Sequence, residues 1–225
     1  MERLYSMEKS HFWSRARLHL ILDLLRTLSP GKQVLDVGCG TGHLVARLEE
    51  TDFIATGIDP QPAFFSSHTS QLIQASAEKL PFPQESFDAV VMADVLEHLE
   101  EEAPLGEAFR VLVPGGILLL TVPAFPWLWS RRDERARHLR RYRTKDLHSI
   151  AHRFNGKLID LRFYQCLLFP LFLLSRWLRI SPDKETALPS WLNSLFFQIN
   201  RLELWLGKWV RWPWGSSLIA VIKKP

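Results

Sequence analysis

Cysteines and long apolar runs are scarce in this sequence. Its 225 residues include only two cysteines, Cys39 and Cys166, and their spacing fits neither a disulfide framework nor a metal site. No stretch reaches the roughly 18 uninterrupted apolar residues of a membrane-spanning helix. Residues 1–9 lack the apolar core of a secretory signal. We therefore expect a cytoplasmic protein that has no disulfide and binds no metal.

A strong net charge is also missing. The chain has 28 Lys and Arg residues against 24 Asp and Glu residues, a net charge of +4, which by itself does not indicate a nucleic-acid-binding protein. The charge is unevenly distributed, because residues 131–145 contain eight basic and two acidic side chains. This segment forms one basic patch, and the rest of the chain is slightly acidic.

The most informative motif is a glycine-rich turn after an apolar stretch. Residues 34–42 read VLDVGCGTG, which predicts a buried strand that turns through three glycines into a helix. Glycine permits positive φ and close approach to a ligand, and the start of the helix points free N–H groups into the turn. A dinucleotide fingerprint would need a small residue at position 43, where this chain has His43. The turn therefore predicts a nucleotide-type cofactor other than NAD or FAD.

Together with later segments, this turn resembles the motifs of the class I S-adenosylmethionine (SAM)-dependent methyltransferases, in particular their small-molecule branch, the methyltransferase type 11-like proteins. The matching segments are LDVGCGTG at 35–42, GID at 57–59, AEKLPF at 77–82, FDAVV at 87–91, LEH at 96–98 and RVLVPGG at 110–116. As an ordered set they are far more specific than any one of them. They imply an enzyme that uses SAM and releases S-adenosylhomocysteine.

Strands and helices are expected to alternate along the chain. The sequence predicts strands near 33–37, 54–58, 72–75, 87–92 and 116–122, and helices near 42–50, 61–68, 101–112 and 144–154. This alternation predicts an α/β fold with a Rossmann-like sheet, mostly parallel and covered by helices on both faces. Residues 157–165 and 217–223 are expected to pair and complete seven strands, with an antiparallel last strand that follows a helical apolar insertion.

Four segments follow from this reading. Residues 1–29 form an N-terminal helical cap, with its helix over residues 12–28, and residues 30–165 form the SAM-binding Rossmann-like core. Residues 166–214 form the apolar, Trp-rich helical insertion. Residues 215–225 form the final edge strand of the core.

The resemblance also assigns the cofactor site. Asp36 is expected near the ammonium group of SAM, and Asp59 is expected to accept hydrogen bonds from the ribose hydroxyls, as the acidic residue about 20 positions after the glycine turn does in dinucleotide folds. Ser76 stands where relatives commonly carry Asp. The full set of expected cofactor residues is Asp36, Gly38, Cys39, Gly40, Gly42, Asp59, Pro60, Ser76, Ala77, Glu78 and Asp94.

A base is expected after the fourth strand. Asp94, Glu97 and His98 lie in this segment, and histidine is the side chain whose unperturbed pKa best suits proton removal near neutrality. We therefore expect His98 to be the catalytic residue. An oxygen acceptor would need such a base more than an amine would.

Two segments that combine aromatic and basic residues are expected to line the acceptor pocket. They contribute His11, Trp13 and Arg17 before the core and His138, Arg141 and Tyr142 after the fifth strand. Arginine suits phosphate or carboxylate, so an anionic acceptor is expected. His138 and Tyr142 would face the pocket together if their segment is helical. For each arginine the alternative is a salt bridge or a solvated surface.

The C-terminal part of the insertion is rich in tryptophan. Residues 188–214 contain Trp191, Trp205, Trp209, Trp212 and Trp214. A helix there would be apolar nearly all round and would need a cover, either a second copy of the chain, a greasy substrate or a membrane surface. Tryptophan beside Lys and Arg is typical of membrane interfaces, so peripheral contact with the inner face of a membrane is one expectation. The alternative is an ordinary second core.

The leading hypothesis is a methyltransferase that moves a methyl group from SAM to a small or lipid-linked acceptor, at oxygen. A non-catalytic SAM-binding scaffold is one alternative. An RNA methyltransferase is another, suggested by the basic patch, although no RNA-binding module is recognisable and nucleic acid is not the expected partner. Carbon or nitrogen methylation and a homodimer stay open.

Overall fold

A computed structural model confirms the predicted α/β fold. It describes residues 10–61, 69, 71–177, 189–207 and 209–225. One seven-stranded sheet has the strand order β3-β2-β1-β4-β5-β7-β6. The strands are β1 Gln33–Val37, β2 Ile54–Asp59, β3 Leu72–Gln74, β4 Phe87–Ala93, β5 Leu112–Pro123, β6 Lys157–Tyr164 and β7 Ser217–Lys223. Five strands run parallel, and β7 pairs antiparallel with both β5 and β6.

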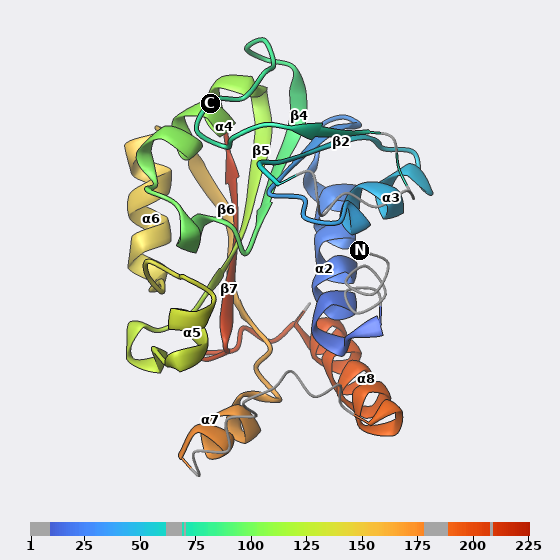
Figure 1. The fold of residues 1–225 in the computed structure, drawn as a ribbon, viewed down its shortest axis with the longest axis vertical. Helices are drawn as coiled ribbons and strands as arrows, with labels where there is room; N and C mark the ends of the chain where they lie inside the picture. The colour runs from blue at the N-terminus through green and yellow to red at the C-terminus, as the bar shows by residue number, and fades with distance from the viewer. Residues whose placement is uncertain (1–9, 62–68, 70, 178–188, 208) are drawn as a thin grey trace.

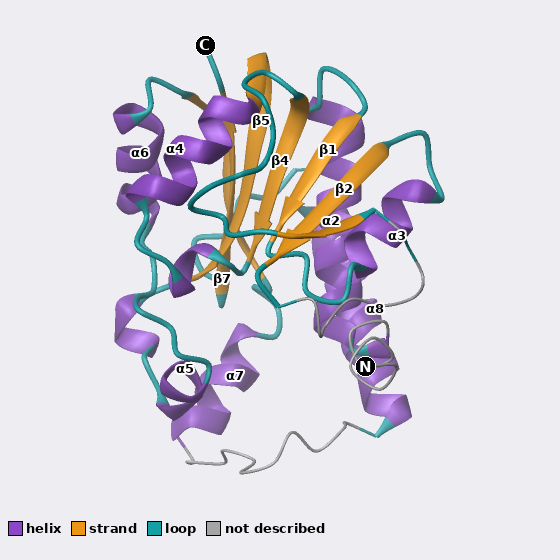
Figure 2. Cartoon of the chain, turned by 45° about the horizontal axis from the view of Figure 1, so that its top comes forward, coloured by secondary structure: helices purple, strands orange, loops and turns teal. Residues whose placement is uncertain are grey.

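Helices cover both faces of the sheet, as Figures 1 and 2 show. On one face, α4 and α6 pack with β5 and β7 around buried Leu105, Phe109 and Ile150. On the other face, α2 and α3 pack with β1 and β4 around buried Leu25 and Val45. The helices are α2 Phe12–Leu28, α3 His43–Glu49, α4 Glu102–Val111, α5 Arg131–Arg135, α6 Thr144–Arg153, α7 Phe169–Trp177 and α8 Ser190–Leu206, with short 3₁₀ turns η2 Leu96–His98 and η3 Pro126–Leu128.

The position of β7 corrects one expectation. Residues 215–225 were expected to form the edge strand, but β7 lies between β5 and β6, and β6 is the edge. Burial explains this order, because every β7 residue from Ser217 to Ile222 is buried, whereas most of β6 is only partly buried. A strand that is apolar on both faces needs a partner on each side and helices above and below it. The helix expected over 61–68 lies outside the described residues.

Helix α8 packs on α2 through a side that includes buried polar residues. The Asn193 amide joins the two helices, because its Oδ1 accepts from the Phe12 N–H at 2.9 Å and its Nδ2 donates to the Ser10 carbonyl at 2.8 Å. The buried residues of α8 are Phe197, Asn200 and Glu203. Its exposed surface includes four large apolar side chains, Trp191, Leu195, Leu202 and Trp205, each about half exposed or more.

No helix in the described part of the chain is long and apolar enough to cross a membrane. The exposed large apolar side chains of α8 lie on the side of the helix away from α2. They leave an apolar surface for which the described residues provide no cover.

The functional part of the sheet is fixed by its topology. Strand β1 lies between β2 and β4, so the connections that leave the carboxyl ends of β1 and β4 run in opposite directions. Ligands of open α/β sheets bind in the crevice that this reversal creates. The glycine-rich turn follows β1, and Asp94 follows β4, so both expected cofactor segments meet at this point.

Candidate functional site

The glycine-rich turn connects β1 to α3 through three left-handed residues. Gly38, Gly40 and Gly42 have φ of +72°, +52° and +79°, values that a residue with a Cβ rarely adopts. At Gly38 a Cβ would also lie 2.5 Å from the Val95 side chain, and at Gly42 it would lie 2.7 Å from Leu72. The Gly38 and Cys39 N–H groups donate to the Ile58 carbonyl at 2.8 and 2.9 Å, which ties the turn to β2.

A cavity of about 220 Å³ lies between this turn, the end of β4 and helix α2. Its polar lining includes two carboxylates, Asp36 and Asp94, and one guanidinium group, Arg17. Asp36 is buried at the end of β1. Asp94 accepts a hydrogen bond from the Thr121 hydroxyl at 2.8 Å and forms an ion pair with Arg17. The cavity is also lined by Ser14, Leu18, Ile21, Gly38, Cys39, Gly40, His43, Leu44 and Ala93.

Asp59 holds the turn from the end of β2. Its carboxylate accepts hydrogen bonds from the Gly40 N–H at 3.1 Å and from the Gln61 N–H at 2.8 Å. A carboxylate oxygen can accept more than one hydrogen bond. Asp59 can therefore keep the turn in place and still accept from a ligand hydroxyl.

A tight turn follows β3 at residues 76–79. The Ser76 hydroxyl accepts from the Glu78 N–H at 3.2 Å, and the Ser76 carbonyl accepts from the Lys79 N–H at 3.2 Å. Ala77 is buried. Pro60 lies near the end of this strand, because its carbonyl accepts from the Gln74 side chain at 3.3 Å. Ser76, which stands where relatives commonly carry Asp, thus holds its own turn.

Past the end of β4, η2 places a carboxyl and an imidazole beside a second imidazole. The His98 and His138 rings pack edge to face with centroids 4.8 Å apart. Burial, together with the neighbouring His138, lowers the pKa of His98, so its imidazole is neutral at physiological pH. Burial and the Asp94 charge raise the pKa of Glu97 to about 9, and the side chain of Glu97 is only 1% exposed.

Asp133 is the buried anchor of the segment that carries His138. Its Oδ1 lies 3.1 Å from His138 Nδ1 and accepts from Arg141 Nε at 2.7 Å, and its Oδ2 accepts from the Ser130 N–H at 2.8 Å. Burial alone would raise the pKa of Asp133, but the hydrogen bonds from His138 and Arg141 outweigh burial and hold this pKa well below its usual value. Asp133 therefore remains ionised.

Comparison with known proteins agrees with this geometry. Residues 35–120 match the sequence family described as "Methyltransferase domain". This match supports a class I SAM-dependent methyltransferase domain over these residues. An uncharacterized methyltransferase of Mycobacterium tuberculosis is 35% identical over 109 residues, which cover 46% of this chain and 42% of that protein. The 2-methyl-6-phytyl-1,4-hydroquinone methyltransferase of Synechocystis is 28% identical over 198 residues, which cover 83% of this chain and 60% of that enzyme.

A solved structure supports the fold. The phosphoethanolamine N-methyltransferase 2 of Haemonchus contortus, in complex with SAM, superposes with a TM-score of 0.60 at 19% identity, over 92% of this chain and 52% of that chain. The chain thus spans about two fifths to three fifths of the length of these three proteins.

The cofactor of the methyltransferase domain is SAM, and the residues present fit it. SAM combines a cationic sulfur and ammonium group with a ribose that has two hydroxyls. The cavity between the strand ends has two carboxylates, and a third, Asp59, holds the same turn. This donor set suits a cationic amino acid end and a hydroxyl-bearing sugar. The residues that could hold the cofactor are thus Asp36, Gly38, Cys39, Gly40, Asp59 and Asp94.

Of the three residues expected around the acceptor before the core, Arg17 lines the cavity, Trp13 lies in the first turn of α2 and His11 precedes this helix. His11 caps α2, where its Nδ1 accepts from the Trp13 N–H at 3.3 Å. Trp13 is held between β6 and α5, because its carbonyl accepts from the Tyr164 hydroxyl at 3.2 Å and the Arg132 guanidinium lies 5.7 Å from its ring. Arg17 lines the cavity of the methyltransferase domain.

The other segment differs from its expected form. Residues 138–142 are not helical, so His138 and Tyr142 do not lie one helical turn apart. Tyr142 is buried, and its hydroxyl donates to the Leu96 carbonyl at 3.3 Å, while burial raises the pKa of its phenol. Arg141 donates to Asp133 and to the Ala124 carbonyl at 3.0 Å. Tyr142 and Arg141 thus brace the loop, and His138 alone of this expected set adjoins His98.

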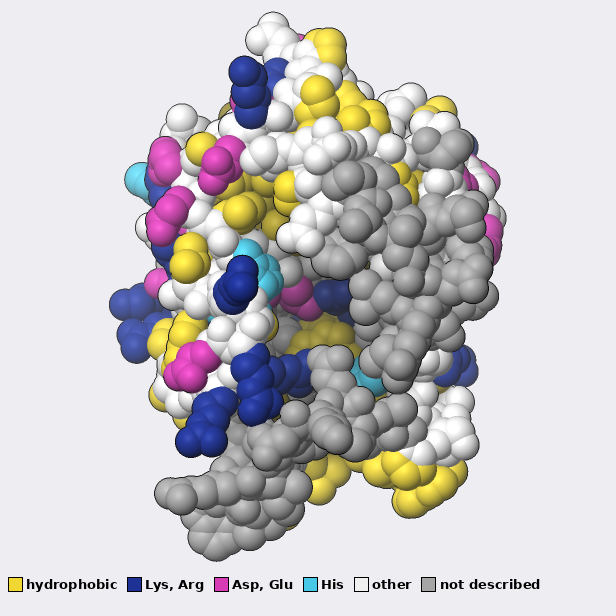
Figure 3. Space-filling view, viewed as in Figure 1, with side chains coloured by type: hydrophobic (Ala, Val, Ile, Leu, Met, Phe, Trp, Pro, Cys, Tyr) yellow, Lys and Arg dark blue, Asp and Glu magenta, His cyan; other side chains and the backbone are white. Residues whose placement is uncertain are grey.

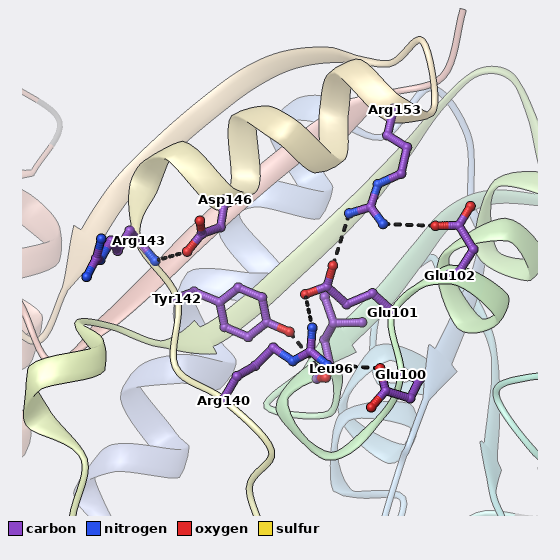
Figure 4. A network of polar contacts seen from close by, with 9 residues as sticks. All are labelled: Leu96, Glu100, Glu101, Glu102, Arg140, Tyr142, Arg143, Asp146 and Arg153. Atoms are coloured by element: carbon purple, nitrogen blue, oxygen red, sulfur yellow. Dashed lines mark hydrogen bonds and ion pairs between the residues drawn. The ribbon is translucent and has the colours of Figure 1, made fainter.

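Two arginines of the basic patch, Arg140 and Arg141, form ion pairs within the fold. Arg140 donates to Glu100 at 3.0 Å and to Glu101 at 3.1 Å, and Arg153 bridges Glu101 and Glu102 (Figure 4). Figure 3 shows Lys and Arg side chains that remain on the surface at the lower left of this face. The pairing of these arginines fixes the loops around the methyltransferase site and leaves less charge for a polyanion.

Asp133 is the site residue that the sequence analysis missed. The signal was Ser130 followed three residues later by an acidic residue, a capping-box pattern. Both reciprocal hydrogen bonds of this box are present at the start of α5. The pattern indicated a helix start, but not that the same carboxylate also binds His138 and Arg141.

Proposed function

We propose that this protein is a SAM-dependent methyltransferase that methylates a hydroxyl group of a small or lipid-linked acceptor. The observation that carries the proposal is the cavity at the carboxyl ends of β1 and β4, which joins the glycine turn, two carboxylates and helix α2. SAM supplies a methyl group on a positively charged sulfur, which the acceptor atom displaces. The protein has to bind both molecules in line and, for a hydroxyl acceptor, promote loss of its proton.

The cofactor residues have distinct roles in this proposal. Asp59 accepts from the ribose hydroxyls, Asp36 faces the ammonium group, and the main chain from Gly38 to Gly42 lies along the amino acid end. The turn at Ser76, Ala77 and Glu78, with Pro60, borders the adenine. The Arg17–Asp94 ion pair closes the opposite wall, where α2 covers the cavity.

His98 accepts the proton of the acceptor in this proposal. Its lowered pKa keeps the imidazole neutral at physiological pH, which is the form that a general base needs. His138 packs against it from the loop after β5 and restricts the ring. A hydroxyl acceptor profits most from this arrangement, because an alcohol or phenol is a weak nucleophile while it holds its proton.

The apolar side chains that α8 exposes support the proposal that the acceptor has an apolar part. Trp191 is 68% exposed and Trp205 is 55% exposed on a helix whose buried side is partly polar. We propose that α2, α7 and α8 together form the acceptor side of the molecule, and that the exposed apolar side chains of α8 guide a lipid-linked molecule or contact the surface that carries it. The name of the Synechocystis relative describes a hydroquinone with a phytyl chain, which combines hydroxyls with an apolar tail.

Two measurements on one sample test this function. Calorimetric titration with SAM and with S-adenosylhomocysteine should give micromolar or tighter binding, and methyl-labelled SAM should then transfer label to an extractable lipid. Binding without any labelled product would favour a non-catalytic scaffold, and label in RNA would favour the RNA alternative. Absence of binding would overturn the cofactor assignment.

The Asp59→Asn substitution tests the cofactor site at one residue. Loss of the negative charge should weaken SAM binding by roughly 30-fold, since a hydrogen bond to a charged group contributes about 1.5–3 kcal/mol. Calorimetry on Asp59→Asn and on the exposed Asp52→Asn measures this. Asp52 pairs only with Lys32, at 3.3 Å on the surface, so its variant should bind normally. Equal affinity in both variants would contradict the role of Asp59.

A further inference from the structure

Three potential ligand atoms converge beside the cavity. Glu97, His98 and His138 each offer one atom, and these atoms all lie within 4.8 Å of one another. Three atoms at such separations lie within about 2.8 Å of a common point. Zinc binds imidazole nitrogen and carboxylate oxygen at about 2.0–2.2 Å. Small side-chain rotations would therefore bring all three to bonding distance.

One oxygen of the buried Glu97 carboxyl has no hydrogen-bond partner among the described residues. Glu97 is 1% exposed, and the oxygen in question is its Oε2. The neighbouring carboxylates are already paired, Asp94 with Arg17 and Asp133 with Arg141. Glu97 forms no ion pair among the described residues. A buried carboxyl that carries a charge is normally paired or bound to a metal.

His138 is oriented as a metal ligand would be. Its Nδ1 lies 3.1 Å from Asp133 Oδ1, which accepts a hydrogen bond when Nδ1 carries the proton. That tautomer presents the Nε2 lone pair. A carboxylate that holds the second nitrogen of a histidine is a recurring feature of metal sites, because it fixes the ring and raises its basicity as a ligand.

We propose that Glu97, His98 and His138 bind a divalent transition-metal cation, such as Zn²⁺. Two imidazoles and one carboxylate favour such a cation over Mg²⁺, which prefers oxygen ligands. Three protein ligands leave at least one coordination position for water or substrate. The proposal departs from the expectation of no metal, which rested on cysteine spacing and did not consider a histidine from a distant loop.

The site deepens the proposed function and, in its catalytic role, rests on it. When bound, the cation would lower the pKa of a hydroxyl at its open position, and the proton of that hydroxyl would pass to water. His98 then serves as a ligand, and the cation takes over the ionisation of the acceptor that the free imidazole promotes in the metal-free protein. The acceptor would be one with an oxygen that can reach both the cation and the methyl group.

Metal binding to the full chain tests the proposal without a turnover assay. Protein stripped by a chelator is titrated with Zn²⁺ in competition with a chromophoric chelator, and separately with Co²⁺, whose visible spectrum reports the ligand geometry. We expect one equivalent of tightly bound Zn²⁺, a Co²⁺ spectrum of four- or five-coordinate type, and no competition by millimolar Mg²⁺. Glu97→Gln and His138→Gln should each weaken Zn²⁺ binding at least 10-fold.

His148→Gln is the matched control, because His148 is exposed on α6 and its variant should bind Zn²⁺ normally. Thermal melting without metal checks that each variant folds. The proposal is overturned if the folded wild type binds no Zn²⁺, or if Glu97→Gln and His138→Gln bind it as the wild type does. Titration of the same samples with SAM tests the proposed function separately, because Asp59 and the glycine turn contain none of the three ligands.

Discussion

Replacement of His98 by alanine should lower methyl transfer by at least about 100-fold while SAM affinity stays within about twofold of the wild type. A positioned general base contributes roughly 100- to 10,000-fold to a rate. His98 has the neutral imidazole and the position after β4 for this task. The loss should appear in kcat, because the residue acts on the proton of the acceptor and touches neither Asp59 nor the glycine turn.

Single-turnover kinetics with labelled SAM, alongside calorimetry, would measure this separation of turnover from binding. His152→Ala serves as control, since His152 is exposed near the end of α6 and should turn over normally. Wild-type turnover by His98→Ala would refute the assignment. A parallel loss of SAM affinity would instead mean that His98 supports the cofactor cavity and not the acceptor.

The sequence was sufficient for the part of the site that depends on backbone conformation. Glycines at 38, 40 and 42 can be read as left-handed positions because few other residues adopt that conformation, and all three have positive φ. The carboxylates Asp36 and Asp59 follow from their position at the ends of apolar strands. Periodicity and glycine spacing are local properties, so one sequence reveals them.

The part of the site that depends on long-range side-chain contacts was not predictable in the same way. Arg141 and Tyr142 look like pocket residues in a basic, aromatic segment, yet they contact Asp133, Ala124 and Leu96. These contacts arise because the loop after β5 folds back over η2. The spacing of residues along the chain does not predict that this loop contacts η2.

The same argument applies to strand order. A strand with a continuous apolar run, such as residues 218–222 of β7, can be recognised in the sequence, but its place between β5 and β6 follows from the crossover of the chain. The apolar residues of α8 were likewise recognisable. Asn200 and Glu203 of α8 nevertheless face inward. The Glu203 carboxylate is held there because it accepts from the Cys166 N–H at 2.7 Å and from the Leu167 N–H at 2.9 Å.

Replacement of Asp133 by alanine should destabilise the fold by about 3–5 kcal/mol, the cost of leaving one member of a buried ion pair without its partner. The Arg141 side chain is only 7% exposed and would keep the Ala124 carbonyl as an acceptor but lose its carboxylate. Urea unfolding of both proteins measures the difference. The pKa of Asp133 is lowered by folding, so its stabilisation persists at neutral pH and declines only as the pH falls below about 4, its unfolded value.

The Asp146→Ala variant distinguishes the stability lost when a buried ion pair is broken from the stability lost when a helix cap is removed. Asp146 occupies the same capping-box position at the start of α6 that Asp133 occupies at the start of α5, where it accepts from the Arg143 N–H at 2.7 Å. Loss of a cap alone costs about 0.5–2 kcal/mol. Asp133→Ala should therefore be the more destabilising change by at least about 1 kcal/mol. If the two variants unfold at the same urea concentration, Asp133 is only a cap, and His138 must be held by other contacts.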